Sequence, residues 1–280
     1  MTDNILAFQG VPGAYADLAC RSVYPAMDTL SCGSFEECFV AVRDLKAKYA
    51  MIPVENSIAG RVADIHHLLP EGGLYIVGEH YQRVLHHLLG LPGAQIEQIK
   101  TAKSHIQALT QCRKFLASHN IRPVSSGDTA GGAKDVAEQG DPSVAGIASS
   151  LAGEIYGLQS LAADIADMPE NTTRFLILAR EPQIPAVGDF CMTSLLFRVR
   201  SVPAALYKAL GGFATCGVNL TKIESYLVGG RFDAAQFYID VEGHPDERPL
   251  KLALEELAFF ASEVRILGTY PAHPFRRRPV

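Results

Sequence analysis

The order in which apolar and amphipathic segments follow one another constrains the fold of this chain more than any other feature. Over the first 180 residues, short apolar runs typical of buried strands alternate with segments whose apolar residues recur at helical spacing. Strands that alternate with helices of this length predict parallel βαβ units and hence an α/β fold. The predicted strands are 5–8, 49–54, 74–79, 144–148 and 174–179, and the predicted helices are 35–45, 61–69, 105–117, 129–139, 150–158 and one that begins near Ala14.

The pattern changes near residue 182. Residues 180–190 carry two prolines and a glycine without periodicity, and we place a linker at 183–190. Beyond it the sequence predicts a strand, a helix opened by Pro203, two strands joined at Gly229–Gly230, a second helix and a last strand. This βαββαβ order predicts a ferredoxin-like domain at 191–280.

The composition narrows the functional class. A net charge of −5 argues against a nucleic-acid partner, and the one basic run, Arg276 to Arg278, reads as a solvated tail. No basic leader and no uncharged run of about 18 apolar residues is found, so we expect neither a signal peptide nor a membrane span. The six cysteines are scattered and form no C-x-x-C pair, which favours reduced thiols in a cytoplasmic protein without a metal site.

Five polar clusters follow predicted strands or open predicted helices. Ligands of open α/β sheets bind at the carboxyl ends of parallel strands, so the clusters suggest a polar pocket for a small anionic ligand. Each cluster also has a structural explanation, because Glu55, Asn56, Ser104, Asp128 and Thr129 are all placed to cap a helix or a turn. Both interpretations stay open on spacing alone. The clusters are 9–15, 55–57, 104–105, 127–133 and 171–175.

Several common catalytic motifs are missing. The chain has no P-loop, no dinucleotide-binding fingerprint, no G-x-S-x-G elbow and no zinc-ligand spacing. A cofactor-free reaction on a small carboxylate, or binding of one, therefore fits the sequence best.

Over essentially its whole length, the sequence resembles the prephenate dehydratase family. The stretches that carry the resemblance are "PVENSIAGRV" (53–62), "SHIQALTQC" (104–112), "NTTRF" (171–175) and a C-terminal part similar to the ACT amino-acid-sensing module. The resemblance implies an enzyme of phenylalanine biosynthesis that removes carbon dioxide and water from prephenate to give phenylpyruvate. It implies that this reaction needs no cofactor. It also implies a catalytic region at 1–182 and an ACT regulatory domain at 191–280. The catalytic region would have two α/β lobes, similar to type II periplasmic binding proteins, with crossovers near residues 78 and 165.

The resemblance also implies roles for individual residues. Thr173, the threonine of T-R-F, is the expected catalytic residue, and its hydroxyl would assist the departing hydroxide. Arg174 is the candidate for a substrate carboxylate, with a structural salt bridge as the alternative, and Phe175 would form an apolar wall. The remaining expected substrate-binding residues are Asn56, Ser57, Ser104, Thr129 and Asn171.

In the C-terminal part, the resemblance implies an allosteric phenylalanine site and a homodimer or homotetramer. The two corresponding segments are "GVNL" and "ESYL", and in the second Tyr226–Leu227 replaces the family's usual Arg-Pro. The residues expected to bind phenylalanine are Gly217, Val218, Asn219, Leu220, Glu224 and Ser225.

Two departures from the family pattern lie in the catalytic region. Ile106 stands where the family usually has proline, and Asp128 stands where it usually has serine. A carboxylate at 128 either caps the following helix or meets an amino group, and arogenate, the aminated analogue of prephenate, carries one. The alternatives to prephenate dehydratase are therefore an arogenate dehydratase and a non-catalytic sensor of small carboxylates.

Overall fold

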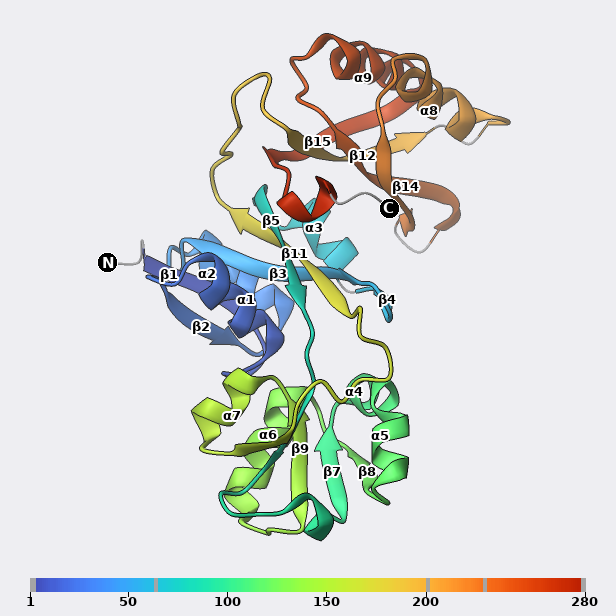
Figure 1. The fold of residues 1–280 in the computed structure, drawn as a ribbon. Helices are drawn as coiled ribbons and strands as arrows, with labels where there is room; N and C mark the ends of the chain where they lie inside the picture. The colour runs from blue at the N-terminus through green and yellow to red at the C-terminus, as the bar shows by residue number, and fades with distance from the viewer. Residues whose placement is uncertain (1–3, 63–64, 200–201, 229–230, 278–280) are drawn as a thin grey trace. The chain divides into compact units, whose positions relative to one another are not determined.

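In the computed structural model, residues 4–62, 65–199, 202–228 and 231–277 are described, and they contain three β-sheets (Figure 1). The chain divides into two compact units: Met1–Ile65 with His80–Phe175, and His66–Glu79 with Leu176–Val280. The boundary passes through two strands, between Glu79 and His80 and between Phe175 and Leu176. The second unit combines residues 66–79 with the C-terminal part of the chain, so this division does not test the expected linker at 183–190. That boundary stays a prediction.

The first sheet has six strands in the order β2-β1-β3-β11-β5, with β4 paired to β3. β1 runs parallel to both β2 and β3, as the βαβ pattern predicts. The predicted helix at 61–69 begins later, at Ile65, because residues 60 and 61 pair with the end of β3. The strands are β1 (Ile5–Gln9), β2 (Asp28–Cys32), β3 (Tyr49–Asn56), β4 (Gly60–Arg61), β5 (Tyr75–Arg83) and β11 (Thr172–Ala179), and the helices are α1 (Tyr15–Val23), α2 (Phe35–Arg43) and α3 (Ile65–Glu71).

The second sheet has five strands in the order β10-β6-β9-β7-β8. β7 is parallel to β8 and β9, but β6 is antiparallel to β9 and β10, so the sheet is mixed and not wholly parallel. The single helix predicted at 105–117 is two helices that meet at Cys112. The strands are β6 (His87–Gly90), β7 (Thr101–Ser104), β8 (Arg122–Ser125), β9 (Val144–Ala148) and β10 (Gln159–Ala162), and the helices are α4 (Ile106–Gln111), α5 (Arg113–Ser118), α6 (Thr129–Gln139) and α7 (Ser150–Tyr156).

The third sheet is built entirely from residues after 190, and its βαββαβ element order confirms the sequence prediction (Figure 1). Its four strands lie in the order β13-β14-β12-β15 and pair antiparallel where their register is defined. Helix α8 begins at Ala205 and not at Pro203, so the predicted start is wrong by two residues. The predicted turn at Gly229–Gly230 lies outside the described residues. The elements are β12 (Cys191–Val199), α8 (Ala205–Thr215), β13 (Leu220–Val228), β14 (Arg231–Glu242), α9 (Arg248–Phe260) and β15 (Ala261–Pro271).

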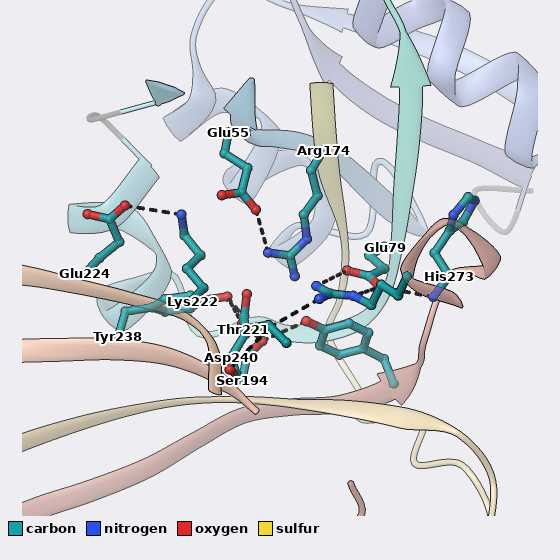
Figure 2. Close-up of polar contacts among 12 residues, drawn as sticks. Glu55, Glu79, Arg174, Ser194, Thr221, Lys222, Glu224, Tyr238, Asp240 and His273 are labelled. Carbon is teal, nitrogen blue, oxygen red and sulfur yellow. Dashed lines mark hydrogen bonds and ion pairs between the residues drawn. The ribbon is translucent and has the colours of Figure 1, made fainter. Parts of the chain in front are cut away.

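Each face of this third sheet carries buried side chains. On one face, Leu195 and Phe197 of β12 pack with Phe213 of α8 and Leu257 of α9 in an apolar core. The other face carries Ser194, which donates a hydrogen bond to the buried carboxylate of Asp240 (Figure 2). The phenolic hydroxyl of Tyr238 donates a second hydrogen bond to the same carboxylate, at 2.6 Å. This buried acid is therefore held by hydroxyl donors, as a charge removed from water requires.

Arg276 forms a buried ion pair, so the expectation of a solvated tail is wrong for this residue, whereas Arg277 is exposed as expected and Arg278 lies outside the described residues. The guanidinium of Arg276 binds both carboxylate oxygens of Glu79, with N–O distances of 2.6 and 2.8 Å. The backbone N–H of His273 donates to the same carboxylate at 3.0 Å (Figure 2). The Glu79 side chain is fully buried and that of Arg276 is 10% exposed. The pair joins β5 to the 3₁₀ turn Pro274–Arg277 within the second unit. No helix among the described residues is long and apolar enough to cross a membrane.

We expect Arg276→Met to destabilise the second unit, because the carboxylate of Glu79 would stay buried without its cation. Breaking a buried pair in this way costs about 3 kcal/mol or more, which corresponds to a fall of roughly 6 °C or more in Tm. Arg277→Met is the matched control, since Arg277 is exposed and lies over the Phe190 ring, a contact worth at most about 1 kcal/mol.

Thermal unfolding followed by circular dichroism measures both variants. Adding Glu79→Gln to Arg276→Met should recover part of the loss, because it removes the stranded charge. Equal effects of Arg276→Met and Arg277→Met would contradict a buried ion pair.

Candidate active site

The first unit contains a cavity of about 540 Å³ at the carboxyl ends of β1 and β3. Residues of α4, of the start of α6 and of the segments next to them, together with the segment before β6, complete the lining. Thr173 and Phe175 of β11 lie two residues apart, on the same face of the strand, and both line the cavity. The polar and charged residues of the lining are Gln9, Tyr15, Asn56, Arg61, His86, His105, Gln107, Gln111, Asp128, Thr129, Asn171 and Thr173.

Helices α1, α4 and α6 begin at this cavity, and the start of α1 favours an anionic ligand. Helix α1 starts at Tyr15 after an N-cap, Ala14, whose side chain makes no capping bond, and both residues line the cavity. The N–H groups and the dipole of a helix N-terminus attract negative charge. Helix α6 differs, because Asp128 already accepts a hydrogen bond from the N–H of Gly131 at 2.6 Å. The capping interpretation of Asp128 is confirmed, and its carboxylate also lines the cavity.

Asn56, the last residue of β3, organises the polar wall. Its Oδ1 accepts hydrogen bonds from the backbone N–H groups of Ile58 at 3.0 Å and Ala59 at 2.8 Å. Its Nδ2 donates to Oδ1 of Asn171 at 2.7 Å and to Oγ1 of Thr173 at 3.0 Å. Because the Thr173 oxygen is an acceptor in this contact, its own hydroxyl hydrogen is available to a ligand in the cavity.

Five of the eight residues that the sequence assigned to catalysis and substrate binding line this cavity: Asn56, Thr129, Asn171, Thr173 and Phe175. Ser57 instead fastens the loop before β11, since its Oγ donates to the carbonyl of Glu170 and accepts from the N–H of Thr172. Ser104 is fully buried and donates to the carbonyl of Ile147 in the neighbouring strand β9, at 2.6 Å. The helix that follows is capped by His105 and not by Ser104, so that capping prediction is wrong.

Arg174 lies on the opposite face of β11 from Thr173. Its side chain is 2% exposed, and its Nη1 pairs with Oε1 of Glu55 at 2.9 Å (Figure 2). It does not line the cavity. This geometry supports the structural salt bridge and not the binding of a substrate carboxylate.

The sequence interpretation missed several lining residues. Arg61, from the short hairpin of β3 and β4, brings a guanidinium to the cavity, although Arg61 was part of the recognised "PVENSIAGRV" stretch. His105, Gln107 and Gln111 come from "SHIQALTQC", where only Ser104 was singled out. For these residues the sequence signal existed, because the helical spacing of 107 and 111 puts both on one helix face.

A second cavity, of about 400 Å³, lies in the second unit. Gly217, Val218 and Asn219 line it, together with the acidic residues Glu242 and Glu247. Leu220 packs against the core between the sheet and α8 and α9. Glu224 and Ser225 do not line this cavity, and Glu224 pairs with Lys222 at 3.2 Å (Figure 2). The structure thus brings together only the first of the two expected phenylalanine-binding segments.

Comparison with known proteins identifies the family. The model of the prephenate dehydratase family matches residues 6–183. A bifunctional N-acyl-homoserine lactone acylase/prephenate dehydratase from Komagataeibacter europaeus is 51% identical over 278 residues, which is 99% of each chain. Arogenate dehydratase/prephenate dehydratase 1 from Arabidopsis thaliana is 41% identical, over 95% of this chain and 71% of its own length.

Two solved structures are similar to nearly the whole chain. A quorum-quenching acylase, GqqA, has a TM-score of 0.93 and 52% identity, covering 98% of this chain and 100% of its own. The prephenate dehydratase of Arthrobacter aurescens in complex with L-Phe has a TM-score of 0.89 and 29% identity, covering 99% of this chain and 92% of its own. The family model and these relatives place the chain among the dehydratases of aromatic amino-acid biosynthesis. The chain belongs to the prephenate dehydratase family.

Proposed function

We propose that this protein is a prephenate dehydratase and that Thr173 assists the departure of the ring hydroxyl. The proposal is supported by the hydrogen bond from Asn56 Nδ2 to Thr173 Oγ1, because it leaves the hydroxyl hydrogen of Thr173 available to a ligand. In the reaction, the bond between the ring and its carboxylate breaks, and the released electron pair completes the aromatic ring. The carbon–oxygen bond to the hydroxyl breaks at the same time, and the hydroxide leaves as water after taking up one proton. A hydrogen bond aimed at the leaving oxygen stabilises the charge that develops there.

The remaining lining residues suit the charges of the substrate. Arg61 supplies a guanidinium for the carboxylate that the product retains, in the role that the sequence gave to Arg174. The departing carboxylate loses its charge as carbon dioxide forms, so an apolar environment favours that step. Phe35, Val62, Val84 and Phe175 provide such a wall.

We also propose that the C-terminal βαββαβ domain is an ACT module that senses phenylalanine. Support comes from the cavity at Gly217, Val218 and Asn219, where the carboxylates of Glu242 and Glu247 suit an ammonium group. The L-Phe complex of the Arthrobacter aurescens enzyme is consistent with this proposal. We further propose that the protein forms a homodimer or homotetramer in the cytoplasm.

Two other activities have a specific observation in their favour. Asp128 at the cavity suits the ammonium group of arogenate, and several plant relatives are named arogenate dehydratases. The relative from Komagataeibacter europaeus is also named an N-acyl-homoserine lactone acylase, and it matches this chain over 99% of its length. Side-by-side assays of the purified protein with prephenate, arogenate and an N-acyl-homoserine lactone rank the three substrates by kcat/KM.

The first prediction concerns catalysis. Purified protein should convert prephenate to phenylpyruvate, and Thr173→Ala should lower kcat about 100-fold or more, because one hydrogen-bond donor to the leaving group is lost. Thr173→Ser keeps the hydroxyl and should stay within about tenfold of the parent. Phenylpyruvate absorbance in alkali measures each rate. No product from the parent protein would refute the proposed function, and a normal kcat for Thr173→Ala would remove Thr173 from the mechanism.

The second prediction separates the two arginines. Arg61→Gln should raise the KM for prephenate about tenfold or more with little change in kcat, since a charged hydrogen bond to the bound carboxylate is lost. Arg174→Gln should instead lower the melting temperature while the folded enzyme keeps its KM. The opposite result, a KM effect of Arg174→Gln alone, would restore the role that the sequence suggested.

The third prediction concerns regulation. Phenylalanine should inhibit turnover, and Asn219→Leu should weaken phenylalanine binding at least tenfold in isothermal titration calorimetry, because its amide lines the second cavity. Ser262→Ala, on β15 and away from that cavity, is the matched control and should bind as the parent does. Unchanged binding in Asn219→Leu would locate the phenylalanine site elsewhere.

A further inference from the structure

Three further side chains extend the hydrogen-bonded wall of the cavity beyond Asn171. Asn171 Nδ2 donates to Oε1 of Gln111 at 2.9 Å. The same oxygen lies 2.9 Å from Nε2 of His86, and Nδ1 of His86 lies 2.9 Å from the hydroxyl of Tyr15. All three of these residues line the cavity, and His86 is only 2% exposed.

The direction of each hydrogen bond from Asn56 to His86 follows from two backbone groups that can only donate. The backbone N–H groups of residues 58 and 59 require an oxygen, so Oδ1 of Asn56 must face them and its Nδ2 must face Asn171. Asn171 therefore presents its oxygen to Asn56 and its nitrogen to Gln111. Gln111 in turn must present Oε1 to this nitrogen, which turns its NH₂ group away from Asn171.

The second neighbour of Gln111 Oε1 is His86, and this fixes the hydrogen on the imidazole. Two acceptors cannot face each other, so Nε2 of His86 carries a hydrogen and donates it to Gln111. Burial lowers the pKa of His86, which favours the neutral ring with a bare Nδ1. Burial also raises the pKa of Tyr15, so its hydroxyl keeps its hydrogen. The hydroxyl donates this hydrogen to the carbonyl of Leu85 at 2.7 Å, and a bare Nδ1 of His86, 2.9 Å from the same hydroxyl, is a second acceptor for it.

We propose that His86 is a positioning residue: as the Nε2–H tautomer held by Tyr15, it locks the amide of Gln111 so that the NH₂ group faces the cavity as a donor to a substrate carboxylate. If the amide of Gln111 were rotated, its Oε1 would face the anionic substrate. Its own NH₂ group would then face the N–H donors of His86 and Asn171. The hydrogen of Thr173 and the NH₂ group of Gln111 are then two donors held by one directional chain. The inference deepens the proposed function and rests on it only for its kinetic test.

Nitrogen-15 NMR of the full-length protein with labelled histidine tests the tautomer without any substrate. The signals of His86 are assigned by their loss in His86→Gln. We expect a neutral ring with the hydrogen on Nε2 at pH 7. A hydrogen on Nδ1 alone, or a charged ring, would overturn the proposal whatever the protein catalyses.

Kinetics of two His86 variants test the consequence for binding. His86→Leu removes the donor and should raise the KM for prephenate about tenfold, with kcat within about threefold, because the carboxylate contact persists from ground state to transition state. His86→Gln offers an N–H near the position of Nε2 and should keep KM within about threefold. A purely structural role would instead lower the amount of folded enzyme and leave KM unchanged.

A neighbouring histidine provides the matched control. His87 contacts the hydroxyl of Ser160 at 2.9 Å and does not line the cavity, so His87→Leu should keep the parent KM. If His86→Leu does not fold, Tyr15→Phe removes one hydroxyl from the same chain and should raise KM about threefold. An unchanged KM in His86→Leu, or in Tyr15→Phe where that variant is needed, would overturn the proposal. An equal rise in KM in His86→Leu and His86→Gln would overturn it as well. Absence of turnover in the parent protein would count against the proposed function alone, since the NMR result stands apart from it.

Discussion

Two backbone N–H groups hold the side chain of Asn56, and the polar wall of the cavity depends on that contact. A carboxamide can rotate to exchange its donor and acceptor ends, but the amides of Ile58 and Ala59 accept only one orientation. The tight turn between β3 and β4 supplies both of them. This orientation assigns donor and acceptor directly for Thr173 and for Asn171, which is 115 residues away in sequence, and through Asn171 for Gln111. A local turn thus determines the chemistry of side chains from three separate segments.

The sequence predicted best what a single strand or helix decides locally. Helix α6 has the bounds expected from its spacing, and Asn56, Asn171 and Thr173 were found because they stand at strand ends. The βαββαβ order was likewise readable, because both of its helices carry long amphipathic patterns. Strand β2 was missed because "DTLSC" has few apolar residues and lies at the sheet edge, where one side needs no apolar cover.

Other features depend on which face a side chain occupies or on contacts between distant residues. Thr173 and Arg174 are adjacent in sequence, yet the alternation of a strand sends one into the cavity and the other toward Glu55. Strand β11 begins at Thr172, two residues before the predicted start, so Arg174 lies inside the strand and not at its first position. The pair of Glu79 and Arg276 joins residues 197 positions apart, and a run of three arginines gives no hint of it. Periodicity reports the environment of a segment, but it does not identify partners across the fold.

The charges around the cavity explain why the carboxylate of Asp128, the one acidic residue among the described lining residues, is compatible with an anionic ligand. Its oxygen accepts the N–H of Gly131 and lies at the N-terminus of α6, where the helix dipole offsets part of its negative charge. Arg61 comes from the β3–β4 hairpin, a different element, so the cation and the acid approach the cavity from separate segments. A ligand with a carboxylate near Arg61 and a neutral or positive group near Asp128 satisfies both. In the proposed function, substrate preference therefore depends on the group that meets Asp128, whereas the proposed role of Thr173 concerns the leaving hydroxyl that prephenate and arogenate share.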